Sequence, residues 1–134
     1  MPTATYDYAL IRLVPRVERG ELLNVGVILF CRTRRFLDAR IAADWPRIVA
    51  LAPWIDPLLV QPHLDVILRI CAGNDAGPIG ELPQTERFHW LTAPRSTIVQ
   101  SSSVYSGLCT DPAATLDSLF ERMVRVTTIA PRAD

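Results

Sequence analysis

The stretch LLNVGVILFC, from Leu22 to Cys31, is the most apolar run in the chain. Its β-branched residues and its central glycine disfavour a helix, and no alternation with polar residues marks one side as exposed. We therefore predict a central strand that is covered on both faces. Gly26 interrupts it, and a glycine inside a strand marks a bulge or the close approach of another segment or a ligand. Close packing is the more common of these reasons.

Two segments with alternating side chains flank this strand, at Tyr6 to Val14 and at Phe36 to Ala43. Alternation indicates strands with one buried face. Short polar connections join the three segments, through residues 16–20 and 32–35. A parallel pair would need a crossover of about a dozen residues, so the pairing must be antiparallel. The first third of the chain is predicted to be a meander.

Helix starts are indicated at Asp44, Asp56 and Asp111, each of which precedes a proline by one or two residues. An Asp at the N-cap followed by Pro in the first turn is a typical helix start. The last of the three helices has apolar residues at three- and four-residue steps, which predicts one buried face. Its buried residues are expected to be Leu116, Leu119, Phe120, Met123 and Val124.

The second helix is expected to break at Pro62, because proline disrupts a helix interior. Its main part then runs from Pro62 to Ala72 and ends at Gly73. Its inward residues are expected to be Leu64, Ile67, Leu68 and Cys71. A loop should follow at residues 74–83, where Gly, Pro, Asn and Asp are concentrated.

The chain has 134 residues with 49% apolar and 21% charged residues, which fits one globular domain spanning residues 1–134. The tail from about residue 127 is expected to be frayed. The predicted fold class is α+β, an antiparallel meander of three to four strands with three helices packed on it.

The formal net charge is zero, which gives no global attraction to nucleic acid or anionic membranes. All fourteen basic residues are arginine, so catalysis by a lysine is excluded. Cys31, Cys71 and Cys109 are an odd number at wide spacings, which indicates reduced core thiols. The sequence shows neither a signal peptide nor a membrane span, and we expect a cytoplasmic protein.

Polar side chains are concentrated in ERFHWLTAPRSTIVQSS, from Glu86 to Ser102. A short helix capped by Thr85 should end at Ala93-Pro94. Residues 96–100 are β-prone and could add a strand to the meander. Trp90 is expected to belong to the core rather than to a stacking platform.

Metal binding and nucleophilic catalysis both lack essential residues in this stretch. Glu86 and His89 could supply two metal ligands from one helix, but no third ligand has a suitable spacing, so no metal or cofactor is expected. A Ser or Cys could pair with His89, but no nucleophile elbow is present. The absence of a complete catalytic set favours a role other than an enzyme.

Anion or partner binding is the remaining chemistry that the stretch supports. Guanidinium groups donate bidentate hydrogen bonds to phosphate or carboxylate, and hydroxyls donate single ones. Arg12 could join the site from the sheet, or it could pair with Asp38 or Glu86. Structural ion pairing is an equally open interpretation. The candidate ligand-binding residues are Arg87, His89, Arg95, Ser96, Thr97 and Arg12.

Four segments resemble the bacterial family called domain of unknown function 3037. They are YDYALIRLVP at residues 6–15, RGELLNVGVILFC at 19–31, ERFHWLTAPRSTIVQ at 86–100 and GLC at 107–109. The resemblance covers nearly the whole chain but brings no catalytic residues. It implies a partner or accessory role, because some relatives are encoded beside kinases similar to the HipA type.

The sequence thus predicts a small cytoplasmic interaction or accessory protein, with a HipA-like kinase as a candidate partner. The alternative is a protein that binds a small molecule, phosphate or carboxylate through residues 86–100, which leaves room for an enzyme. Neither membrane nor nucleic-acid partners are expected, and a homo-oligomer remains open.

Overall fold

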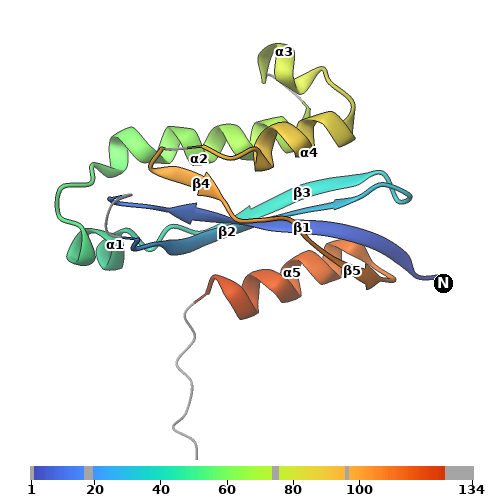
Figure 1. Ribbon diagram of the computed structural model, residues 1–134, viewed down its shortest axis with the longest axis horizontal. Helices are drawn as coiled ribbons and strands as arrows, with labels where there is room; N and C mark the ends of the chain where they lie inside the picture. The colour runs from blue at the N-terminus through green and yellow to red at the C-terminus, as the bar shows by residue number, and fades with distance from the viewer. Residues whose placement is uncertain (1, 17–19, 74–75, 96, 126–134) are drawn as a thin grey trace, which may run out of the picture.

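The computed structural model describes residues 2–16, 20–73, 76–95 and 97–125. A five-stranded antiparallel sheet forms the middle layer. Helices α2 (Pro57–Ala72) and α4 (Gln84–Thr92) lie on one face and α5 (Pro112–Met123) on the other, as Figure 1 shows. The predicted α+β class is confirmed, and the predicted tail from residue 127 lies outside the described residues.

The predicted meander is confirmed: β1 (Ala4–Leu13), β2 (Leu23–Cys31) and β3 (Phe36–Ile41) pair in succession, all antiparallel. The free side of β1 carries two further strands. Strand β4 (Val99–Ser101) pairs with the end of β1, and β5 (Tyr105–Cys109) pairs with its beginning. A strand near β4 was expected from the β-prone residues 96–100, and together the two late strands form one interrupted edge of the sheet.

Strand β2 is buried on both faces, as its continuous apolar sequence predicts. The register with β1 shifts where Ile11 pairs with Gly26 and Arg12 pairs with Asn24, so Val25 is an extra residue at a bulge. A Cβ atom on Gly26 would lie 2.8 Å from the Arg40 carbonyl oxygen and 2.9 Å from Cδ1 of Ile11. Gly26 is therefore explained by tight packing beside the bulge.

Two apolar clusters lie on opposite faces of the sheet, because successive strand residues point to opposite sides. On one face, α1 (Trp45–Leu51), α2 and α4 cover residues from the strands. On the other face, α5 covers the second cluster. Central members of the first cluster are Ile11, Leu13, Ile28, Leu64, Ile70 and Phe88, and those of the second are Leu10, Val27, Leu29, Leu116 and Leu119.

The three expected N-caps are confirmed by hydrogen bonds to their carboxylates. The side chain of Asp44 accepts from the backbone N–H of Arg47, that of Asp56 from Leu58, and that of Asp111 from Ala113 and Ala114. Gly73 ends α2 in the left-handed conformation, at φ 79°. These local signals are strong because an Asp-capped start needs only neighbouring residues.

Three expectations about the helical segments were wrong. Helix α2 continues unbroken through Pro62, which is an exposed residue of the helix. Leu68 is exposed rather than inward, because the buried side of α2 is centred on Val60, Leu64 and Ile67. The expected loop after Gly73 contains a short helix, α3 (Gly77–Gly80).

The start of α4 also differs from the prediction. Pro83 occupies the N-cap and its carbonyl accepts the 3.0 Å hydrogen bond from Arg87 N–H, which places Thr85 inside the helix. The predicted end is confirmed, because Ala93 is extended ahead of Pro94. Five helices, not three, are therefore found in the described residues.

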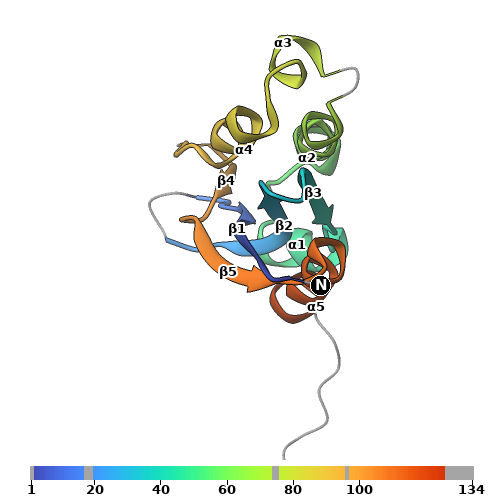
Figure 2. The ribbon, with the colours of Figure 1, turned by 90° about the vertical axis from the view of Figure 1, so that its right-hand side faces the viewer.

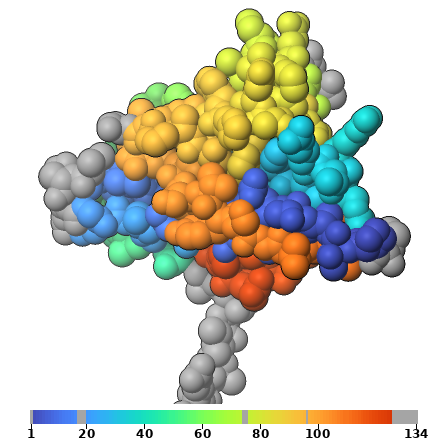
Figure 3. Space-filling model, turned by 45° about the vertical axis from the view of Figure 1, so that its right-hand side comes forward, coloured from blue at the N-terminus to red at the C-terminus, as the bar shows by residue number. Residues whose placement is uncertain are grey.

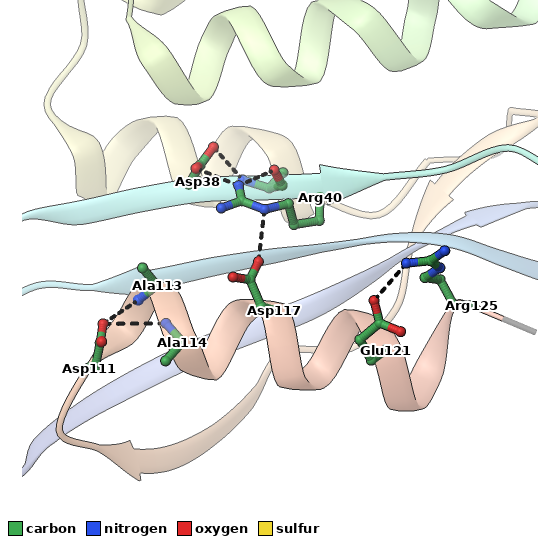
Figure 4. A network of polar contacts seen from close by, with 9 residues as sticks. Asp38, Arg40, Asp111, Ala113, Ala114, Asp117, Glu121 and Arg125 are labelled. Carbon is green, nitrogen blue, oxygen red and sulfur yellow. Dashed lines mark hydrogen bonds and ion pairs between the residues drawn. The ribbon is translucent and has the colours of Figure 1, made fainter. Parts of the chain in front are cut away.

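Polar contacts fasten α5 to the sheet from β3. Arg40 donates to Asp38 on its own strand at 2.7 Å and to Asp117 on α5 at 3.0 Å (Figure 4). A second fastening begins on β1, where Arg12 donates to Asn24 and Asn24 donates to the Met123 carbonyl, each at 3.3 Å. Asp38 and Arg40 are two residues apart and therefore lie on the same side of β3.

The three cysteines are free and buried, as expected for core thiols. Burial raises the pKa of Cys71 from its ordinary 9.0 to about 12. Since the thiolate is the reactive form, this position is inert at neutral pH. None of the helices in the described ranges is long and apolar enough to cross a membrane.

Candidate functional site

A groove beside α2 has a cavity volume of about 450 Å³. Its other walls are Trp90 on α4, Arg95, and residues 97–99 at the start of β4. Figure 2 shows α2 and α4 above the same face of the sheet, with the chain descending from α4 into β4. The groove therefore lies where the polar stretch of the sequence meets α2.

The groove is mainly apolar, with a buried floor and an exposed rim. Val60 and Ile67 of α2 form part of the floor. The rim carries Leu59, which is 70% exposed, and Trp90, which is 39% exposed, together with Val66 and Ile98.

Trp90 was expected in the core and is instead a groove residue, because Phe88 and Leu91 take the buried side of α4. Exposed apolar side chains gathered around a hollow are typical of a binding surface.

Polar groups in the groove come from Arg95, Thr97 and His63. The Arg95 guanidinium carbon lies 4.2 Å from the centre of the Trp90 ring, and one terminal nitrogen donates a 2.7 Å hydrogen bond to the Trp90 carbonyl. Within the described chain, Nε and the other terminal nitrogen of Arg95 have no hydrogen-bond acceptor. They remain available to a carboxylate or a carbonyl of a bound molecule.

Helix α2 contributes to this groove because it has two apolar sides. Val60, Leu64, Ile67 and Cys71 face the sheet, as an amphipathic helix requires. Residues Leu59, His63 and Val66, spaced by four and three, form a second stripe that lines the groove. The second stripe was missed in the sequence, although an excess of apolar residues outside the core-facing side was a usable signal.

Arg87, one of the predicted ligand-binding residues, makes hydrogen bonds to backbone carbonyls of the fold. Its Nε donates to the Leu82 carbonyl and one terminal nitrogen donates to the carbonyls of Ile70 and Cys71, each at 2.8 Å. Gly73 permits this approach, since a Cβ there would lie 3.0 Å from the same nitrogen. Arg87 thereby ties α4 to the C-terminal end of α2, where unpaired carbonyls attract a cation.

The remaining predicted residues do not all gather in one place. Arg95 and Thr97 line the groove, whereas His89 is exposed on α4 and is not part of the lining. Arg12 lies on the α5 face of the sheet, where it bonds to Asn24 and to neither Asp38 nor Glu86. Ser96 lies outside the described residues. The structure thus brings together two of the six predicted side chains, joined by His63 from α2.

A second hollow, of about 270 Å³, lies between the start of β2 and the end of α5. We call it the arginine hollow because Arg47, Arg122 and Arg125 line it. Arg125 is paired with Glu121 at 2.9 Å, which offsets one of the three positive charges. Its arginines also lie near the negative end of the α5 dipole, which is an ordinary position for cations.

Metal coordination and catalysis each need particular side chains to lie close together. No group of three His, Cys, Asp or Glu side chains there is placed to hold a metal ion. The groove offers apolar surface, one guanidinium, one imidazole and one hydroxyl, and the Thr97 hydroxyl already donates to the Val99 carbonyl at 2.7 Å. These groups can bind and orient a partner, whereas acid–base or nucleophilic work would need a paired base.

Comparison with known proteins is informative at the level of the family. No curated protein and no solved structure gives a significant match. A family described as "Protein of unknown function (DUF3037)" matches residues 8–124, which include the groove, all of α5 and the whole sheet except the first four residues of β1. The match agrees with the resemblance carried by the four sequence segments. The chain therefore belongs to the DUF3037 family.

Proposed function

We propose that this protein is an interaction module that binds an apolar segment of a partner protein in the groove lined by α2, Trp90, Arg95 and residues 97–99. The observation that carries the proposal is the second stripe of α2, in which the apolar residues Leu59 and Val66 lie on either side of His63. Leu59 and Val66 remain exposed although the core has enough apolar residues without them. A monomer that leaves such side chains beside a hollow gains stability when a partner covers them.

A protein segment fits this surface better than a small molecule does. The groove volume alone would suit either kind of ligand. Other exposed apolar side chains lie outside it, however, at Leu51 and Trp54 before α2. A small ligand inside the groove would leave these residues in water, whereas a longer segment could cover them. The extended apolar surface is thus the reason to prefer a protein partner.

The charge in the groove indicates one feature of the partner segment. Arg95 is the one guanidinium in the described lining, and two of its nitrogens have no acceptor within the described chain. A carboxylate of the partner could accept a charge-assisted hydrogen bond from either nitrogen. We therefore expect apolar anchor residues followed or preceded by an Asp or Glu. A kinase similar to the HipA type is the candidate partner that the family resemblance suggests.

Selection from a library of displayed peptides tests the proposal and defines the sequence that the groove prefers. Wild-type protein should enrich peptides that combine two or more apolar residues with an acidic residue. These peptides should fail to bind Leu59→Glu, which places a charge on the groove rim. They should still bind Leu58→Glu, since Leu58 is exposed outside the lining. Failure to enrich any peptide, or equal binding to both variants, would contradict the proposal.

Phosphate or carboxylate binding is a second candidate function, and the arginine hollow is the observation in its favour. Three guanidinium groups line one hollow, and Arg47 makes no side-chain hydrogen bond or ion pair within the described residues. A ligand at a hundred times its dissociation constant adds about 2.7 kcal/mol to folding stability. A thermal-shift series with inorganic phosphate should therefore raise Tm for wild type but not for Arg47→Met. Equal shifts in the two proteins would remove this candidate.

A further inference from the structure

Strand β5 is an open edge of the sheet. It pairs with β1 on one side, and no other strand in the described chain pairs with it. In an antiparallel pair, every second residue directs its backbone N–H and C=O away from the partner strand. Figure 2 shows β5 at the outer limit of the sheet, with α5 below it. A row of backbone donors and acceptors is therefore presented to the outside.

This edge lacks the usual protection against pairing with another strand. Natural edges are guarded by charged residues, prolines or coverage by another element. Residues 97–110 contain no Asp, Glu, Lys, Arg or Pro. The opposite edge is different, because β3 carries the ion pair of Asp38 and Arg40. Only one of the two edges of the described sheet is thus chemically suited to strand addition.

Apolar side chains accompany the open backbone. Leu108 is 70% exposed and Val104 is 45% exposed, and both lie on the same side of the chain as Ser106 because they are two residues away from it. Tyr105 lies on the other side, with its ring 5.5 Å from that of Tyr8. Figure 3 shows the orange segment that includes β5 at the surface, with no other element in front of it. Burial of these side chains would add to the backbone hydrogen bonds.

We infer that β5 pairs with β5 of a second copy, in an antiparallel arrangement around a two-fold axis at Ser106. In this register residue 104 of one copy faces residue 108 of the other, so two Val104–Leu108 contacts form. Apolar cross-strand pairs of this kind stabilise antiparallel strands. Two-fold symmetry is the commonest symmetry of homo-oligomers, and it requires a self-complementary surface. The five-stranded sheets of the two copies then form one continuous sheet.

Electrostatic repulsion does not oppose this pairing. The nearest carboxylate is Asp7 on β1, which accepts a hydrogen bond from Ser106. Three strand spacings separate the two copies of Asp7, which is about 14 Å. This separation exceeds the Debye length of about 8 Å at physiological ionic strength, so the two charges are largely screened. A neutral edge is consequently better matched to its own copy than to a strongly charged strand.

The dimer should be weak and concentration-dependent. Pairing of residues 104–108 alone buries less than the roughly 1,200 Å² of stable specific interfaces. Analytical ultracentrifugation from about 10 µM to about 1 mM, a range in which weak interfaces populate dimers, should show reversible association. Leu108→Lys should remain monomeric over this range, because two like charges then enter the pairing edge. Leu58→Lys, which alters an equally exposed leucine on α2, should associate as wild type does.

Disulfide trapping tests the register. Opposed residues of an antiparallel pair have Cα atoms about 4.5 to 5.5 Å apart, which a disulfide can span. Ser106→Cys should therefore form a covalent dimer within minutes of mild oxidation, while the three buried native cysteines stay reduced. Ser118→Cys, at an exposed position on α5, is the matched control and should cross-link much more slowly. A monomer at every concentration, or equal cross-linking of the two variants, would overturn the inference.

Discussion

Arg95 folds back onto Trp90, with its guanidinium carbon 4.2 Å from the ring centre and a terminal nitrogen 2.7 Å from the Trp90 carbonyl oxygen. Both residues line the groove, and both are partly exposed. The contact fixes the position of the guanidinium while leaving other nitrogens accessible. A cation over an exposed aromatic ring contributes only about 0.5–1 kcal/mol.

Replacement of Arg95 by alanine should therefore have a small effect on the fold. The lost cation–π contact and hydrogen bond are both at the surface, and we expect a destabilisation of about 0.5–1 kcal/mol. Urea denaturation of wild type and Arg95→Ala measures this difference. A loss several times larger would show that Arg95 holds the groove together rather than serving a partner.

Arg87, eight residues earlier in the same stretch, should behave in the opposite way. Arg87→Met removes three hydrogen bonds to backbone carbonyls and leaves those of Ile70 and Cys71 without this cation. The expected cost is about 2–3 kcal/mol in the free energy of unfolding. Arg69→Met, an exposed change on the last turn of α2, should cost less than about 1 kcal/mol. Equal losses at the two positions would contradict a structural role for Arg87.

Ser102 fills a gap between β4 and β5. Its hydroxyl accepts the Leu10 N–H at 2.8 Å, while its own N–H donates to the Leu10 carbonyl at 2.9 Å. Ser102→Ala leaves a buried N–H without an acceptor, which should cost about 1–3 kcal/mol. Ser103→Ala is the control, because that side chain is exposed, and it should change stability by less than about 0.5 kcal/mol. Chemical denaturation distinguishes the two.

Cys71 should make stability depend on alkaline pH. Burial raises its pKa from 9.0 to about 12 in the folded state. Between these values the unfolded chain loses the thiol proton and the folded chain keeps it, so folding stability falls as pH rises. The slope should approach about 1.4 kcal/mol per pH unit above pH 9, relative to Cys71→Ala. Parallel pH profiles of wild type and Cys71→Ala would show that the thiol titrates alike in both states.

Sequence patterns predicted the features of this fold that depend on neighbouring residues. The run around Gly26, the caps at Asp44, Asp56 and Asp111, and the left-handed Gly73 all act within one strand or one helical turn. The predicted break of α2 at Pro62 was wrong because neighbouring residues alone do not decide it. The cost of a helix-interior proline depends on what surrounds the unpaired carbonyl, and burial of that site is a tertiary property.

The candidate site was predicted only in part, because it depends on contacts between distant residues. Arg95 and Thr97 were identified by residue type, but their partner His63 lies on α2, far earlier in the chain. Arg87 and Arg95 have the same side chain, but Arg87 lies beside the C-terminal end of α2 and donates hydrogen bonds to its carbonyls. The sequence alone does not show this proximity. The family resemblance, in contrast, was readable directly and is confirmed over residues 8–124.

The dissociation constant of a groove-selected peptide, measured by calorimetry with Leu59→Glu and Leu58→Glu, tests the proposed function most directly. Both variants change an exposed leucine of α2 to the same charged residue, and only Leu59 lines the groove. The groove proposal predicts at least about tenfold weaker binding for Leu59→Glu, which is about 1.4 kcal/mol, and an unchanged affinity for Leu58→Glu. Equal affinity of the peptide for wild type and Leu59→Glu would contradict it.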